Sequence, residues 1–103
     1  MVNPDVQGLR PTHPGEVLRE IVLPATGKPK TWIANALGVS RQQLHDVLAE
    51  RKPVSNAMAL RLAKLFGGEA ETWARLQMNY DLRVAAETMT DELARIPTLD
   101  AAA

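Results

Sequence analysis

A chain of 103 residues is expected to fold as one domain, and its 46% apolar residues suffice for a compact core. It has no cysteine, which excludes disulfides and thiolate metal clusters, and no apolar run reaches the roughly 18 residues of a membrane span. The N-terminus lacks the apolar core of a signal peptide, so we expect a cytoplasmic protein. The net charge is zero, but residues 28–64 carry seven basic and two acidic side chains, a net charge of +5, and the remainder carries −5. This asymmetry favours a polyanion bound at the central block.

The chain opens with an arm and a first helix. Residues 1–12 contain prolines and a glycine with little periodicity, which predicts a flexible N-terminal arm. The first helix is expected to begin at His13, with Pro14 in its first turn, and to end at Leu23-Pro24. Its buried face is predicted to consist of Val17, Leu18, Ile21 and Val22. His13 has no second ligand at metal-binding spacing, so we interpret it as a capping or packing residue.

Residues 30–49 form the pattern around which the chain is organised, two short helices joined by a tight turn. Gly38 suits a left-handed helix C-terminus, Val39 is expected to enter the core, and Ser40 is a good N-cap for the second helix. Both helices have an apolar face at helical spacing, made of Ile33, Ala34, Leu37, Leu44, Val47 and Leu48. Trp32 lies beside this face, and we expect it to pack on the first helix rather than stack on a base. The pattern is that of a helix-turn-helix, whose second helix enters the major groove of DNA.

The second helix of this pattern carries candidate base-reading residues on the side opposite its apolar face. These residues are Arg41, Gln42, His45 and Asp46, with Gln43 at the edge of the same face. Arginine pairs bidentately with guanine and glutamine with adenine, whereas an aspartate accepts from cytosine N4 or repels phosphates at wrong sites. Ordinary solvation is the alternative explanation. The helix nevertheless lacks the glutamate–lysine pairs that are typical of a merely solvated face.

Cations, hydroxyls and amides near the helix ends are predicted to contact the DNA backbone. Such contacts give affinity and register but carry no sequence information. The N-terminus of a helix also offers backbone N–H groups to a phosphate. The predicted phosphate-contacting residues are Lys30, Thr31, Ser40, Arg51, Lys52, Ser55 and Asn56. Residues 50–55 are expected to form a loop, in which Pro53 stops the second helix and Ser55 caps the helix that follows.

Two further helices and a tail complete the predicted chain. Apolar spacing predicts a helix over residues 56–66, ended by a glycine pair, and a long helix over residues 69–87. One stripe of the long helix is interpreted as core or dimer surface, and it comprises Trp73, Leu76, Gln77, Tyr80 and Val84. The candidate dimer contacts within it are Trp73, Leu76, Tyr80 and Val84. Residues 88–103 are predicted to be a tail with a marginal helix that Pro97 breaks. The predicted fold class is therefore all-α.

Three segments of the chain carry a family resemblance. They are H-P-G-E-V-L-R-E-I-V-L-P (13–24), A-L-G-V-S-R-Q-Q-L-H-D-V-L (36–48), and M-A-L-R-L-A-K-L-F-G followed by W-A-R-L-Q-M-N-Y-D-L (58–67 and 73–82). The middle segment is shared by many repressors. The H-P-G-E opening combined with the L-Q-x-x-Y-D-L ending is more particular, and together they resemble the HigA-type antitoxins, a branch of the Xre/Cro-repressor-like helix-turn-helix superfamily.

The resemblance implies a five-helix, lambda-repressor-like DNA-binding domain over residues 13–87, followed by a short C-terminal extension. It implies a homodimer, with the C-terminal helices at the two-fold interface, that binds a palindromic operator upstream of its own operon. It also implies neutralisation of a cognate HigB-type toxin, an mRNA-cleaving RNase of the RelE-like fold. By position, the operator-reading residues of the family fall on Arg41, Gln42, His45 and Asp46.

Three other hypotheses use parts of the same pattern. A stand-alone Xre-type regulator shares all these residues and differs only in having no toxin partner. A protein-interaction module that no longer binds DNA disagrees with the retained basic block and the polar outward face. An enzyme is disfavoured because there are two histidines, no cysteine and no Gly-rich phosphate loop. His45 and Asp46 diverge by roughly 100° on a helix, so they cannot form a hydrogen-bonded catalytic pair in the usual geometry. No catalytic residue, cofactor or metal is expected.

Overall fold

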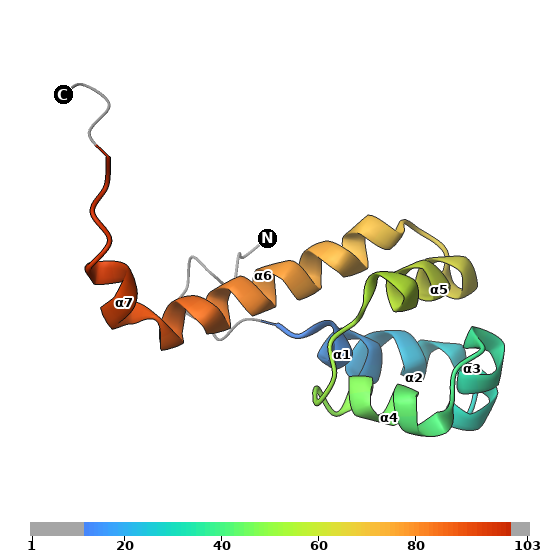
Figure 1. Ribbon diagram of the computed structural model, residues 1–103. Helices are drawn as coiled ribbons and strands as arrows, with labels where there is room; N and C mark the ends of the chain where they lie inside the picture. Colours follow the sequence, from blue (N-terminus) through green and yellow to red (C-terminus); the bar gives the residue numbers. More distant parts are fainter. Residues whose placement is uncertain (1–11, 100–103) are drawn as a thin grey trace.

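The computed structural model describes residues 12–99, and within this range every regular element is a helix (Figure 1). The elements are α1 (Pro14–Val17), the π-helix η1 (Leu18–Val22), α2 (Leu23–Thr26), α3 (Lys30–Leu37), α4 (Arg41–Leu48), α5 (Asn56–Phe66), α6 (Ala70–Thr88) and α7 (Thr90–Ala94). The first three are continuous and form one rod. This rod and α3 to α6 are the five helical segments that the resemblance implies. The described residues exclude residues 1–11 of the predicted arm and residues 100–103 of the predicted tail. None of the described helices is long and apolar enough to cross a membrane.

The first rod runs through Pro24, so the predicted helix end at that residue is wrong. The intervening π-helix explains the continuity, because the backbone N–H of Leu23 donates to the carbonyl of Leu18, five residues back. The wider turn accommodates a proline, which has no N–H to satisfy. A π-helical turn contains one residue more than an α-helical turn, so it also changes which side of the rod is buried. Leu18 and Leu23 are buried, whereas Ile21, predicted to face inward, is 65% exposed.

Local capping signals determine the next helices as predicted. Gly38 ends α3 with a left-handed φ of 74°. The hydroxyl oxygen of Ser40 accepts the N–H of Gln43 at 3.0 Å and so caps α4. The hydroxyl oxygen of Ser55 caps α5 in the same way, accepting the N–H of Met58 at 3.1 Å. The turn and both helix starts therefore follow from the sequence alone.

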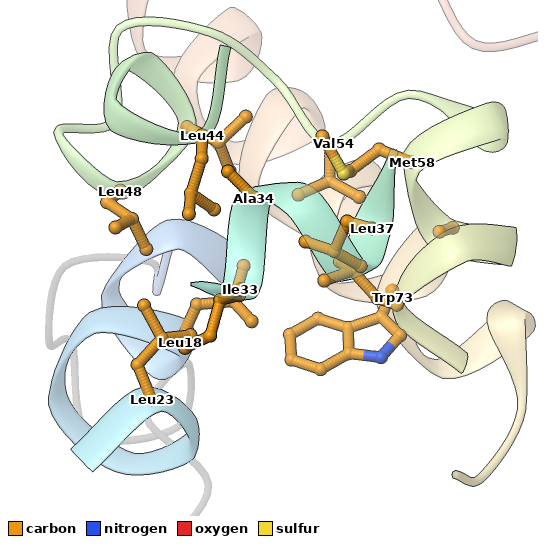
Figure 2. Packing of buried hydrophobic residues seen from close by; sticks show 13 residues of the cluster. Leu18, Leu23, Ile33, Ala34, Leu37, Leu44, Leu48, Val54, Met58 and Trp73 are labelled. Atoms are coloured by element: carbon orange, nitrogen blue, oxygen red, sulfur yellow. The ribbon is translucent and has the colours of Figure 1, made fainter. Parts of the chain in front are cut away.

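The core gathers around α3. Its members are Leu18, Leu23, Ile33, Ala34, Leu37, Leu44, Val47, Leu48, Val54, Met58, Ala59, Leu62 and Trp73. Figure 2 shows Ile33 and Leu37 in the middle of this cluster, with Leu18 on one side and Trp73 on the other. Val39 packs against the cluster, as predicted for the residue after the turn. Each large apolar side chain buried here contributes roughly 1.5–3 kcal/mol, so the cluster fixes α3 and α4 against the rest of the chain.

Trp32 is predicted to pack on the first helix, but the structure shows it at the surface. It is 46% exposed, and the ammonium of Lys28 lies 5.0 Å from the centroid of its ring. The contact is a cation–π interaction on the surface, worth about 0.5–1 kcal/mol at an exposed site. This tryptophan of α3 therefore belongs to the surface of the protein.

The stripe of α6 divides between core and surface. Trp73 is 8% exposed and belongs to the core of the protomer, and Leu76 packs partly against it. The amide oxygen of Gln77 accepts the buried N–H of Val54 at 2.7 Å, and its nitrogen donates to Asp81 at 2.9 Å. This amide fixes α6 to the loop before α5. Trp73 and Gln77 therefore serve the protomer core, the first of the two roles predicted for the stripe.

His13 joins the start of the first rod to α6. It is 2% exposed, its Nδ1 accepts the N–H of Gly15 at 2.9 Å, and its ring meets that of Tyr80 edge to face, with centroids 4.8 Å apart. The predicted capping and packing role of His13 is thus confirmed. Burial lowers the pKa of His13 below its usual value of 6.5, although the negative charges of Glu50 and Asp81 oppose the shift.

The lowered pKa of His13 predicts a loss of stability in mild acid. As the pH falls below about 6.5, the unfolded chain binds a proton that the folded chain resists, so the free energy of unfolding decreases until the folded pKa is passed. One such group contributes a slope of at most about 1.4 kcal/mol per pH unit. In His13→Asn, which keeps an N-capping side chain, this part of the slope should disappear. Urea unfolding of both proteins between pH 5 and 8 measures it, and identical slopes would contradict the assignment.

The C-terminal part of α6 and the extension have no core of their own. Residues 85–99 are all exposed, and Figure 1 shows α7 leading away from the other helices. The short helix α7 ends before Pro97, in agreement with the predicted marginal helix in the tail. This part of the chain leaves apolar side chains uncovered, among them Met89 and Leu93.

Candidate nucleic-acid interface

The exposed side of α4 brings together three of the predicted base-reading residues. Leu44, Val47 and Leu48 are buried, which fixes the rotation of the helix about its axis. Its outward face then displays Arg41, Gln42 and His45, all exposed. A helix that presents a cation, an amide and an imidazole on one face can hydrogen bond to base edges in a major groove.

Two open grooves flank this face and meet at Gln42. The first is lined by Lys30, Arg41, Gln42, Leu44 and His45. The second lies toward the loop after α4 and is lined by Ser40, Gln42, Gln43, Asp46, Val47, Lys52, Pro53, Ser55 and Met58. Each groove has a lysine on its wall, Lys30 in the first and Lys52 in the second. Each groove beside the exposed face therefore offers one lysine that could contact a phosphate.

The remaining predicted phosphate contacts lie around the two grooves. Thr31, Arg51 and Asn56 are exposed but line neither groove. Ser40 and Ser55 use their oxygens as acceptors in the helix caps. A capping hydroxyl keeps its own proton, which remains able to donate to a phosphate oxygen. The caps and the predicted phosphate contacts are therefore compatible.

Gln43 has a structural role that its exposed position does not reveal. Its side-chain oxygen accepts the N–H of Ser40 at 2.8 Å, while Ser40 accepts the N–H of Gln43. This reciprocal pair is a capping box, which satisfies two N–H groups at the start of α4. Sequence reasoning placed Gln43 at the edge of the base-reading face. The spacing of Ser40 and Gln43 is the signal that identifies the capping box.

Asp46 points toward its own element and the loop that follows. Its Oδ1 accepts from Nε2 of Gln42 at 2.9 Å and from Nη2 of Arg51 at 3.3 Å, and its side chain is 20% exposed. The loop after α4 folds back on Asp46. Glu50 adopts a left-handed φ of 64°, and the backbone N–H groups of Arg51 and Lys52 donate to the backbone carbonyl of Asp46. Consequently α4 ends at Leu48, within one residue of the predicted end at residue 49, and residues 50–55 form the predicted loop.

Two arginines hold the C-terminal ends of the helix-turn-helix. Nη1 of Arg61, on α5, donates to the carbonyl of Leu37 at 2.7 Å, at the end of α3. Nη1 of Arg19, on η1, donates to the carbonyl of Leu48 at 2.6 Å, at the end of α4, and to the carboxylate of Glu50 at 3.2 Å. A cation at these positions satisfies unpaired carbonyls and opposes the negative end of the helix dipole. The arginines thereby fix the turn and α4 relative to the core.

Sequence reasoning missed both arginines in this role. Arg61 belongs to the basic block, yet its guanidinium is engaged at the turn. A Cβ at Gly38 would lie 2.8 Å from Nη1 of Arg61, so a larger residue would displace the end of this flexible side chain in addition to straining the positive φ. Arg61 is 24 residues away from its partner, and a contact of that separation leaves no periodic signal.

Comparisons with known proteins identify similar chains. No protein-family profile matches this sequence. Virulence-associated protein I of Dichelobacter nodosus is 39% identical over 75 residues, which cover 73% of this chain and 69% of the relative.

Two solved structures share the architecture at higher coverage. The antitoxin HigA of Pseudomonas aeruginosa, solved with the higBA promoter, has a TM-score of 0.84 and 34% identity over 88% of this chain and all of that chain. The antitoxin GraA in complex with its operator has a TM-score of 0.82 and 39% identity, over 90% of this chain and 95% of that chain. At this identity and coverage, the similarity extends to the family and beyond the fold alone.

Proposed function

Because this chain belongs to the HigA-type antitoxins, a branch of the Xre-like helix-turn-helix superfamily, we propose that it binds operator DNA as a dimer, represses its own operon and neutralises a RelE-like mRNA-cleaving toxin. The observation that carries the DNA-binding part is the outward face of α4. Arg41, Gln42 and His45 are exposed there between two grooves, each with a lysine on its wall. The solved relatives named above are antitoxins rather than enzymes, and one is in complex with its operator.

In this proposal α4 lies in the major groove and the surrounding cations hold the backbone. Arg41 and Gln42 read base edges, and Lys30 and Lys52 contact the phosphates on either side. Two protomers related by a two-fold axis place their α4 helices about 34 Å apart, one turn of B-DNA. Repression follows because the bound dimer covers the promoter. Affinity falls steeply with salt, since each neutralised phosphate releases counterions.

The dimer contact in this proposal is the outward face of α6. The exposed apolar residues there recur at helical spacing and comprise Met78, Leu82, Ala85 and Met89. Leu82 is 62% exposed, and it lines an open groove together with Met78 and Ala85. Of the dimer contacts predicted from the sequence, Trp73 is buried in the protomer core, whereas Val84 is 37% exposed. A second copy that packs along this face would cover the apolar residues that the protomer leaves in water.

Leu82→Glu tests the dimer contact. The side chain is exposed in the protomer, so the free energy of unfolding of a monomer should change little, while a buried carboxylate in the contact should raise the dimer dissociation constant by about tenfold or more. Leu60→Glu is the matched control, because Leu60 on α5 is 64% exposed and lies on another face. Sedimentation equilibrium measures both variants. A wild-type monomer, or equal dissociation by both variants, would contradict the contact.

The proposed function is tested by an anisotropy titration against the DNA upstream of the chain's own gene, at two salt concentrations, with and without the adjacent gene product. Tight, salt-sensitive and sequence-selective binding that responds to the adjacent product is expected. Selective binding without any such response would favour the stand-alone regulator. Absence of binding at both salt concentrations would leave a protein-interaction module and overturn the DNA-binding proposal.

A further inference from the structure

Asp46 occupies an unusual position among the residues around α4. Among the described residues that line the two grooves, it is the one acidic side chain, and this side chain is 20% exposed. A carboxylate placed beside DNA would repel phosphates unless a cation compensates it. Arg51 supplies that cation, with Nη2 at 3.3 Å from Oδ1. The pair lets an acidic group remain on groove walls whose other charged side chains, among the described residues, are cations.

The same carboxylate oxygen fixes the amide of Gln42. Oδ1 of Asp46 lies 2.9 Å from Nε2 of Gln42, one helical turn away on α4. A carboxylate only accepts hydrogen bonds, so the amide must turn its NH₂ group toward Asp46 and not its oxygen. One N–H of that group is used, and the second N–H and the amide oxygen remain for a base. The glutamine is thereby held in one of its two amide orientations.

The fixed orientation has a consequence for base selection. A free N–H and a free oxygen side by side match adenine, which offers the N7 acceptor and the N6 donor in the major groove. Guanine offers two acceptors, N7 and O6. The fixed amide oxygen of Gln42 would therefore face O6, and two acceptor oxygens cannot form a hydrogen bond with each other. An amide free to rotate could turn its NH₂ group toward O6 and lose part of this discrimination.

We propose that Asp46 is a positioning residue, which holds the Gln42 amide in the orientation that selects adenine over guanine at one operator base pair, with Arg51 compensating its charge. The inference rests on the proposed function that α4 reads operator DNA. It differs from both roles that the sequence suggests for Asp46, which are direct acceptance from cytosine N4 and repulsion of phosphates at wrong sites. Here Asp46 acts through Gln42 and touches no base.

The test is a double-mutant cycle on base selection. Operator duplexes with each base pair replaced in turn are titrated with wild type, Gln42→Ala, Asp46→Ala and the double variant. Wild type should prefer adenine to guanine at one position by about tenfold or more. Asp46→Ala should lose most of the adenine-to-guanine affinity ratio at that position and at no other. In the Gln42→Ala background, Asp46→Ala should cause no further loss of this ratio. Its affinity for a scrambled duplex should stay equal or increase, because a negative charge is removed and Arg51 is released.

A variant of the same shape keeps the test decisive if Asp46→Ala folds poorly. Asp46→Asn keeps one acceptor oxygen, so its adenine preference should lie between those of wild type and Asp46→Ala. Thermal melts of all variants accompany the titrations. An unchanged adenine-to-guanine ratio in Asp46→Ala would overturn the inference, as would a loss that persists in the Gln42→Ala background. No base preference in wild type at any position would instead overturn the proposed function itself.

Discussion

Gly15→Ala should lower the free energy of unfolding by about 3 kcal/mol, although alanine is the better helix former by about 1 kcal/mol. The reason is the close approach of the first rod to α4. A Cβ at Gly15 would overlap the backbone carbonyl oxygen of Val47 and would also meet Nδ1 of His13 at 3.0 Å. A carbonyl of α4 cannot move aside as a flexible side chain can, so the rod must shift away from the core.

Urea unfolding with Gly68→Ala as the control measures this effect. Gly68 has a φ of 82°, and a Cβ there would have no neighbour within 4 Å, so alanine meets only the backbone strain of about 1–2 kcal/mol. The variant at Gly15, in ordinary helical conformation, should be the less stable of the two. If Gly15→Ala is as stable as wild type, the first rod and α4 do not pack as closely as described.

Arg41→Ala should have the largest effect of a single side chain on operator binding. Loss of a bidentate arginine–guanine pair costs about 1–3 kcal/mol, or roughly 5- to 150-fold in affinity for the operator. A scrambled duplex should lose much less, because only one charge is removed. Lys52→Ala should weaken both duplexes by the same factor and reduce the salt slope by about one per protomer.

Lys64→Ala is the matched control for both variants. Lys64 belongs to the same basic block but lines a different groove, with Ala36 and Leu60. Its replacement should leave operator affinity nearly unchanged. If Arg41→Ala lowered binding to operator and scrambled duplex equally, Arg41 would be a phosphate contact and the base-reading face would have to be placed elsewhere on α4.

The parts of the fold that the sequence predicts well are those with local causes. Gly38, Ser40 and Ser55 act on backbone groups within a few residues, and the predicted bounds of α5 agree with those observed. The run through Pro24 is not predictable in this way, because the rule that proline ends a helix assumes α-helical hydrogen bonding. The π-helical hydrogen bonds of η1 let the helix continue through the proline, and the spacing of the apolar residues does not indicate a π-helix.

The contacts that could not be predicted join distant elements or involve competing partners. Arg19 and Arg61 reach carbonyls 29 and 24 residues away. Trp73 lies on an apolar stripe of α6, and the spacing of such a stripe is the same whether it packs against the protomer core or against a second copy of the chain. The burial of Trp73 shows that it packs against the protomer core. Asp46 has the spacing of an outward residue on α4, but the turn at Glu50 brings Arg51 to its carboxylate.

The most direct test of α4 as the DNA-reading helix is to map which element of the protein lies next to the operator. The chain contains no cysteine, so His45→Cys creates a single attachment point for an iron-EDTA cleavage reagent on α4. Thr72→Cys is the control, at the start of α6, which Figure 1 places on the side of the fold away from α4. Reagent at position 45 should cut the upstream duplex in two clusters about one helical turn apart, and reagent at position 72 should cut weakly. Equal cleavage from both positions, or none from position 45 on bound DNA, would contradict the assignment of α4 as the DNA-reading helix.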